Sequence, residues 1–94
     1  MYFVYIIETE DGTYYTGQTN DIARRFKEHL SGTGGATYLR MHKPEYLVHL
    51  EEYDSRGEAM RREAEIKKDA ELKLSLIDFR RDIREVIATE ESYR

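Results

Sequence analysis

Hydrophobic residues fill both alternating faces of the first segment of the chain. The run YFVYIIET at residues 2–9 is apolar at its even positions and at its odd positions alike. A strand without a polar face is typical of a central strand that is covered on both sides. The run is too short for a membrane span, and it lacks the basic start of a signal peptide. We therefore predict a central β-strand.

A hairpin follows this strand, because Asp11-Gly12 can adopt positive φ in a turn and the chain then returns antiparallel. Two registers are open. A two-residue turn would put Tyr15 opposite Glu8 and on the other face from Tyr5, whereas a three- or five-residue loop puts both tyrosines on one face.

The next apolar pattern has helical spacing. Gly17 is predicted to end the second strand, and the polar residues at 19–21 offer side-chain oxygens to the first turn of a helix. Arg25 and His29 lie four residues apart and border its apolar stripe of Ile22, Phe26 and Leu30. The positions predicted to point away are Arg24, Lys27 and Glu28.

The rest of the chain continues the pattern of short elements. In order, we predict a mobile loop at 31–35, a helical turn at 36–42, a strand at 45–53, a helix from a cap at Asp54 or Ser55 to about Lys68, and a last helix from about Asp69 with a break between 78 and 82. In the strand, Tyr46, Val48 and Leu50 alternate with Leu47 and His49. The order ββα, β, αα predicts an α/β (α+β) fold, with a three-stranded antiparallel sheet flanked by helices.

Length and composition narrow the function. Ninety-four residues suffice for one modest core, which we expect over residues 1–88 with a frayed tail at 89–94. The absence of cysteine excludes disulfides, thiolate metal sites and a cysteine nucleophile, and a reducing cytoplasm is the expected location. The net charge of −4 is weak evidence against nucleic acid, because bases outnumber acids between residues 18 and 43.

One acidic residue is out of place. Glu63 falls within the apolar stripe of the helix predicted from residue 56. The stripe consists of Ala59, Met60, Ile66 and Ala70. An ionised carboxylate facing inward costs several kcal/mol unless a cation or a metal ion compensates it. Arg25 or Lys67 could form a purely structural ion pair with it, and a bound metal is the alternative.

These residues together resemble the GIY-YIG nuclease superfamily, in particular its small single-domain bacterial members. Phe3-Val4-Tyr5 corresponds to the first tripeptide, with Phe3 in place of glycine, and Tyr15-Thr16-Gly17 corresponds to the second. Arg25 and His29 correspond to an arginine and a histidine of the family, and the segment around Glu63 to its metal-binding glutamate. The resemblance covers roughly the first seventy residues, and the ordered set is specific.

The resemblance implies a metal-dependent DNA endonuclease that hydrolyses phosphodiester bonds in branched, flapped or damaged DNA during repair or recombination. Glu63 would hold one Mg²⁺ or Mn²⁺ ion. If the metal ion and a cation nearby lower its phenolic pKa, Tyr5 would accept a proton from the attacking water, and Tyr15 would orient the water or share that role. Arg25 would grip the phosphate oxygens, and His29 would be the partner of a tyrosine or a second proton carrier.

Several further bases are candidates for contacts with the DNA backbone that read no sequence. They are Arg24, Lys27, Arg40, Lys43 and Lys67. Related nucleases take their choice of target from appended DNA-binding modules, so we expect that DNA structure or a protein partner directs this chain to its substrate. We expect no membrane contact, and the sequence does not determine the oligomeric state. Two alternatives are a non-catalytic nucleic-acid-binding module and an adaptor that docks a repair partner. Neither of them needs Glu63 to face inward.

Overall fold

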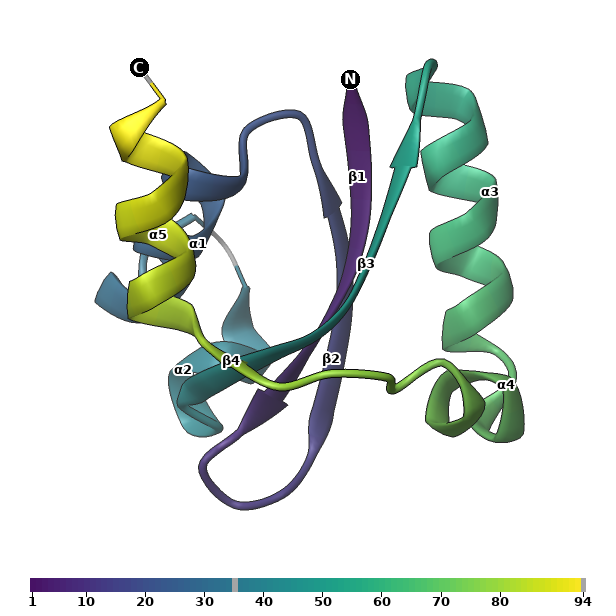
Figure 1. The fold of residues 1–94 in the computed structure, drawn as a ribbon. Helices are drawn as coiled ribbons and strands as arrows, with labels where there is room; N and C mark the ends of the chain where they lie inside the picture. The colour runs from purple at the N-terminus through teal and green to yellow at the C-terminus, as the bar shows by residue number, and fades with distance from the viewer. Residues whose placement is uncertain (35, 94) are drawn as a thin grey trace.

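The computed structural model describes residues 1–34 and 36–93, and its helices and strands alternate in short succession (Figure 1). The elements are β1 (Tyr2–Thr9), β2 (Tyr14–Thr19), α1 (Ile22–Ser31), α2 (Thr37–Met41), β3 (Pro44–Tyr53), α3 (Arg56–Lys67), α4 (Ala70–Ser75), β4 (Arg81–Asp82) and α5 (Ile83–Ser92). Within the described residues, no helix combines the length and the apolar character that crossing a membrane requires.

The antiparallel sheet has four strands in the order β2-β1-β3-β4. The prediction of three strands is therefore wrong by one. β4 consists of two polar residues, Arg81 and Asp82, which pair with Leu47 and Tyr46 of β3. A segment this short carries no alternation, so its pairing with β3 could not be read from the chain.

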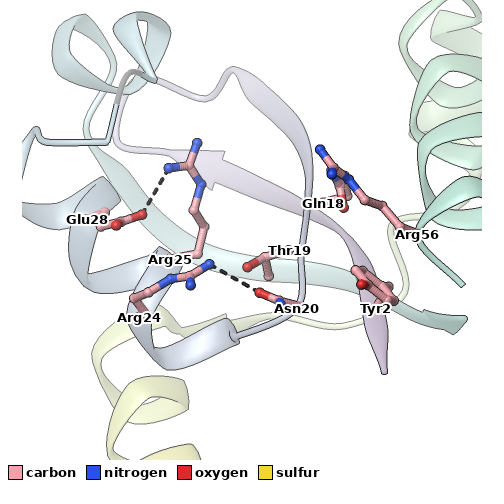
Figure 2. Close-up of a pocket in the computed structure, with 8 residues that line it drawn as sticks. All are labelled: Tyr2, Gln18, Thr19, Asn20, Arg24, Arg25, Glu28 and Arg56. Atoms are coloured by element: carbon pink, nitrogen blue, oxygen red, sulfur yellow. Dashed lines mark hydrogen bonds and ion pairs between the residues drawn. The ribbon is translucent and has the colours of Figure 1, made fainter. Parts of the chain in front are cut away.

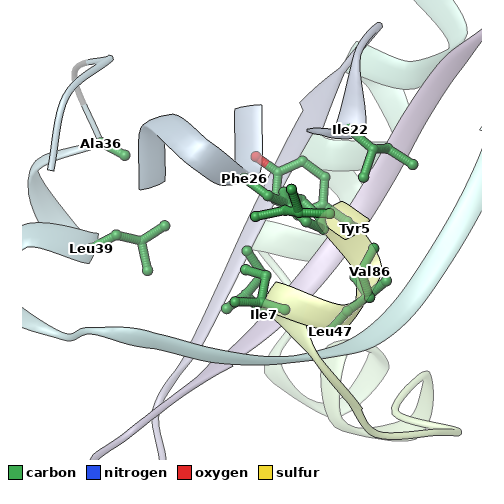
Figure 3. Packing of buried hydrophobic residues seen from close by; sticks show 10 residues of the cluster. Tyr5, Ile7, Ile22, Phe26, Ala36, Leu39, Leu47 and Val86 are labelled. Atoms are coloured by element: carbon green, nitrogen blue, oxygen red, sulfur yellow. The ribbon is translucent and has the colours of Figure 1, made fainter. Parts of the chain in front are cut away.

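Helices cover both faces of the sheet, as the apolar pattern of β1 predicts. In Figure 1, α1 and α5 lie on one side of the strands and α3 lies on the other. Tyr5 and Ile7 of β1 belong to the core cluster shown in Figure 3, together with Phe26 of α1 and residues of α5. Val4 and Ile6 face the opposite way, into a second cluster with residues of α3. β1 is thus the central strand, buried on both sides.

The hairpin settles the register of the two tyrosines. Tyr5 pairs with Gly17, and Tyr15 pairs with Ile7. The pairing of Glu8 with Tyr14 leaves residues 9–13 as a five-residue loop, and Gly12 takes a positive φ of 82° there. Tyr5 and Tyr15 therefore lie on the same face of the sheet. β2 continues through Gly17 to Thr19, so this glycine does not end the strand as predicted.

β3 departs from simple alternation. The pairing with β1 shifts between Ile6 and Ile7, which face His49 and Leu47, so Val48 is an extra residue between them. Because a bulge adds one residue to the strand, the side chains beyond it point to the opposite face of the sheet from the one that simple alternation predicts. Leu50 consequently packs against the cluster of Tyr5 and Leu47, and not with Val48 as predicted.

The helix ends follow the expected caps. Asp21 caps α1 at its start and Gly32, with a φ of 76°, ends it, while Ser55 is the cap of α3. The last predicted helix is divided earlier than expected, because α4 ends at Ser75. α5 continues to Ser92, beyond Thr89, where we expected the ordered part to end. Of the predicted mobile loop and tail, Gly35 and Arg94 lie outside the described residues.

Candidate active site

Helix α1 brings Arg25 and His29 to the sheet at two different depths. His29 is 1% exposed, whereas the Arg25 side chain is 23% exposed. Arg25 Nη1 donates hydrogen bonds to Glu28 Oε1 at 3.0 Å and to the Gly34 carbonyl at 2.9 Å. Glu28 therefore lies beside Arg25, although the helical spacing predicted that it would point away. These contacts hold the guanidinium at the surface of the site.

Tyr5 and His29 form a buried pair beneath Arg25. A hydrogen bond of 2.7 Å joins the Tyr5 hydroxyl to His29 Nε2. Burial, and then the charge of Arg25, lowers the pKa of His29 to about 4. Burial also raises the pKa of Tyr5, and the charges of Tyr15 and Glu63 add to that rise. Both side chains are therefore neutral at pH 7, and His29 Nδ1 has no hydrogen-bond partner among the described residues.

The surroundings of Tyr5 differ from those that the expected role as a base calls for. The expectation required a lowered pKa and access to water, but the pKa of Tyr5 is raised mainly by burial and Tyr5 is 0% exposed. Gly17 packs directly on it, because a Cβ atom at Gly17 would lie 2.5 Å from the Tyr5 hydroxyl. The Tyr5 hydroxyl is thus buried and bonded to His29, and it lies next to the Arg25 guanidinium.

Tyr15 is the more accessible of the two tyrosines. It is half-buried, and its ring centroid lies 6.4 Å from that of Tyr5 and 5.5 Å from that of His29. Because β2 is an edge strand of the sheet, the Tyr15 side chain borders solvent while still touching the buried pair. This position suits a group that orients a water molecule.

Glu63 enters from α3, on the opposite face of the sheet. Its side chain is 20% exposed and contacts Lys67 Nζ at 2.8 Å. Its charge contributes to the raised pKa of Tyr5, after burial and the other causes, which indicates that the carboxylate lies within electrostatic range of the pair. Of the predicted stripe, Ala59 and Ile66 are buried, whereas Met60 and Ala70 are exposed. Glu63 thus lies at the boundary of the core.

A groove of about 350 Å³ lies beside Arg25 and the end of the edge strand β2 (Figure 2), and its lining does not include Tyr5, Tyr15, His29 or Glu63. Its lining consists of Tyr2, Gln18, Thr19, Asn20, Arg24, Arg25, Glu28 and Arg56. Arg24 and Arg25 come from α1, Arg56 comes from the start of α3, and Gln18 and Asn20 come from β2 and the turn that follows it. Three guanidinium groups thus surround one groove. Sequence reasoning missed Arg56, because only the packing of α3 against β2 brings it there.

The other predicted backbone-binding bases are distributed over several surfaces. Lys27 forms an ion pair with Glu91 of α5, and Lys67 is paired with Glu63. Arg40 donates to the Gly32 carbonyl at 2.8 Å. Arg40 and Lys43 line a second cavity of about 520 Å³ together with Arg84. Of the five bases, only Arg24 lines the groove beside Arg25.

Comparison with known proteins agrees with this geometry. The model of the GIY-YIG catalytic domain matches residues 1–92. The chain belongs to the GIY-YIG family. The match includes the last helix as well as the roughly seventy residues with the motifs of the resemblance, and it confirms that the chain is a member of a nuclease family.

Relatives of this GIY-YIG domain are UPF0213 proteins. That of Halobacterium salinarum is 55% identical over 67 residues, which are 71% of this chain and 86% of that protein. That of Syntrophus aciditrophicus is 50% identical over 66 residues, 70% of this chain and 76% of that protein. The solution NMR structure of the UPF0213 protein of Bacillus halodurans is similar with a TM-score of 0.50 and 44% identity, over 81% of this chain and 85% of that one.

The carboxylates of this GIY-YIG domain limit how it could hold a metal ion. Among residues 1–34 and 36–93, no group of three or more His, Asp or Glu side chains could enclose an ion. Glu63 is a single, partly exposed carboxylate whose one ion-pair partner, Lys67, is itself 53% exposed. This donor set fits a hard ion such as Mg²⁺, which retains several waters and takes further oxygen ligands from a phosphate.

Proposed function

We propose that this GIY-YIG domain hydrolyses phosphodiester bonds in DNA with the help of one divalent metal ion. The observation that carries the proposal is that Arg25 and Glu63, which come from helices on opposite faces of the sheet, both lie within electrostatic range of the Tyr5 hydroxyl, which packs against Gly17 of the edge strand β2. Neither is neutralised by the other within the described residues, since Arg25 pairs with Glu28 and Glu63 with Lys67. A phosphate between them would meet a cation on one side and a metal-binding carboxylate on the other.

Arg25 binds the non-bridging oxygens of the scissile phosphate in this proposal. Its Nη1 donates to Glu28 and to the Gly34 carbonyl, and the guanidinium also forms a hydrogen bond with the Tyr5 side chain. These contacts fix the guanidinium plane, and the N–H groups that they leave free bind the phosphate. A positive charge held in advance stabilises the additional negative charge of the transition state. Arg24 and Arg56, which line the same groove, contact neighbouring phosphates and give the salt dependence expected of such contacts.

Tyr15 orients the attacking water, and the buried pair behind it sets the position of its ring. Tyr5 and His29 are both buried and neutral, and their rings contact the ring of Tyr15 from beneath. We assign both of them to positioning. Glu63 holds Mg²⁺ or Mn²⁺, and the bound ion supplies polarisation of the phosphate and stabilisation of the leaving oxygen.

The experiment is cleavage of labelled linear, flapped, forked and four-way DNA with Mg²⁺, with Mn²⁺ and with chelator. We expect metal-dependent product, preferentially from branched or flapped DNA. Glu63→Gln should lower the rate at least about 100-fold, the scale of losing one preorganised group that stabilises transition-state charge. The matched control is Glu65→Gln, which changes an exposed carboxylate on the same helix, paired with Arg62, and should leave the rate within about twofold.

Two results would contradict the proposal. One is the absence of product from every DNA structure with either metal, which with intact binding would favour a non-catalytic module or one that requires a protein partner. The other is Glu63→Gln cleaving as fast as the unchanged protein, because the carboxylate would then not hold the ion.

A further inference from the structure

Three aromatic rings lie side by side next to the proposed active site. The centroids of Tyr15 and Tyr38 are 6.1 Å apart with an angle of 24° between the ring planes. Those of Tyr38 and His42 are 4.3 Å apart at 25°. We call Tyr15, Tyr38 and His42 the aromatic ladder. Its first ring also touches His29, so the ladder leads from the buried pair to the surface.

Contacts on several sides hold the ladder in place. α2 sets Tyr38 and His42 one turn apart, and the His42 N–H donates to the Tyr38 carbonyl at 2.9 Å. His42 Nδ1 donates to Asp11 Oδ2 at 2.6 Å. Leu39, between them in sequence, is 2% exposed and anchors α2 in the core. A ring fixed in this way loses little freedom when a ligand stacks on it.

Tyr38 is the ring of the ladder that is open to a ligand. It is 38% exposed and belongs to neither of the two apolar clusters of the described residues. Aromatic neighbours are usually 4.5–7 Å apart between centroids. The close 4.3 Å contact with His42 supports one side of Tyr38, whereas the 6.1 Å spacing from Tyr15 corresponds to rings that overlap less. Part of the Tyr38 ring therefore faces solvent beside Tyr15.

The charge around the ladder suits a nucleic acid strand. The charge of Arg25 acts on Tyr15, the first ring of the ladder, whereas Arg40 and Lys43 line the second cavity, whose lining does not include Tyr38. Asp11, which touches the ladder from the β1–β2 loop, is bonded to His42 and to the Thr13 hydroxyl. An exposed aromatic ring next to a phosphate-binding cation is the combination with which proteins bind single strands, because every nucleobase has a flat face and every nucleotide a backbone phosphate.

We propose that Tyr38 stacks an unpaired nucleobase next to the phosphate held by Arg25. The substrate class of this site is then a nucleic acid with a single-stranded stretch, such as a flap or a gap, because a base within a duplex is already stacked on its neighbours. This inference rests on the proposed phosphate site, but it can be tested without cleavage.

The test is binding in chelator, so that no bond is broken. The probe is a short single strand that carries one 2-aminopurine, whose fluorescence is quenched when the base stacks on an aromatic ring. We expect quenching with the unchanged protein and with Tyr38→Phe, and none with Tyr38→Leu, which fills space without a ring. Affinity for the single strand should fall about 5- to 100-fold in Tyr38→Leu, while affinity for the same sequence as a duplex stays within about twofold.

Matched arms separate stacking from other effects. Tyr93→Leu removes another exposed tyrosine, 83% exposed at the end of α5, and should change neither quenching nor affinity. Deoxyribose and ribose versions of the strand show which nucleic acid the site prefers. The proposal is overturned if Tyr38→Leu and Tyr38→Phe bind equally well, if Tyr38→Leu weakens duplex and single strand alike, or if no single strand binds. Tyr38-dependent quenching without metal-dependent product would retain this inference while refuting the proposed hydrolysis.

Discussion

Two clusters of this GIY-YIG domain contain the same four residue types and use them differently. The site cluster contains Tyr5, Tyr15, Arg25, His29 and Glu63, and the Glu51 network contains His49, Glu51, Tyr53 and Arg62. In the network, Arg62 donates to both Glu51 oxygens at 2.9 and 3.0 Å. His49 and Tyr53 each add a bond of 2.7 Å to the same carboxylate.

The two glutamates are about equally exposed, at 16% for Glu51 and 20% for Glu63. Burial alone would raise the pKa of Glu51, but hydrogen bonds from Arg62, His49 and Tyr53 hold it at about 2. Glu63 has one ion-pair partner, the exposed Lys67. Residue type and exposure thus do not distinguish a structural carboxylate from a functional one. We propose that the number of partners that already bind the carboxylate oxygens distinguishes the two.

The largest effect should come from breaking the saturated network. Glu51→Ala leaves the Arg62 guanidinium half-buried without its bidentate partner, and loss of one member of a buried pair costs about 3–5 kcal/mol. We expect a decrease of about 3 kcal/mol in the free energy of unfolding measured with urea, and DNA cleavage at a normal rate below the unfolding transition. A decrease of less than about 1 kcal/mol would show that the Glu51 network contributes little to stability, and the contrast between a structural Glu51 and Glu63 would then not hold.

Features encoded by neighbouring residues could be predicted from the sequence. The apolar faces of β1 gave its central position, and Asp21 and Gly32 gave the ends of α1. Lys67 was one of two predicted partners of Glu63, because a spacing of four residues on a helix brings side chains together.

Features that depend on distant pairing could not be predicted. The contact of Gly17 with the Tyr5 hydroxyl follows from the register of β2. The bulge at Val48 exists only in relation to β1. Arg56 joins Arg24 and Arg25 only because α3 crosses the same sheet edge. In each case the local pattern is compatible with more than one arrangement, and tertiary packing selects one.

An intermediate effect should separate the two clusters by pH. The folded pKa of His29 is about 4, below its usual 6.5, so its contribution to stability is complete above pH 6.5 and is lost as the pH falls toward 4. The folded pKa of Glu51 is about 2, below its usual 4.5, so its contribution is lost only as the pH falls from 4.5 toward 2.

Each cluster should therefore have its own window in urea unfolding measured between pH 7 and pH 3. In the unchanged protein, the free energy of unfolding should fall by about 2 kcal/mol between pH 7 and pH 4.5 because of His29, and this fall should be absent in His29→Gln. Glu51→Gln should leave that loss in place and flatten the curve only below pH 4.5. If the free energy of unfolding of His29→Gln falls between pH 7 and pH 4.5 as much as that of the unchanged protein, the fold does not hold the buried imidazole neutral.

The smallest effect on stability should come from Glu63→Gln, although its effect on cleavage is large. Because Lys67 is 53% exposed, loss of this pair should change the free energy of unfolding by less than about 1 kcal/mol in metal-free buffer. Removal of a partly buried charge can even raise stability, since the glutamine keeps the shape of the side chain. Adding Mg²⁺ or Mn²⁺ should raise the melting temperature of the unchanged protein more than that of Glu63→Gln, because only an ionised Glu63 binds the ion. A loss as large as that of Glu51→Ala would mean that Glu63 compensates a buried cation, and its role would then be structural like that of Glu51.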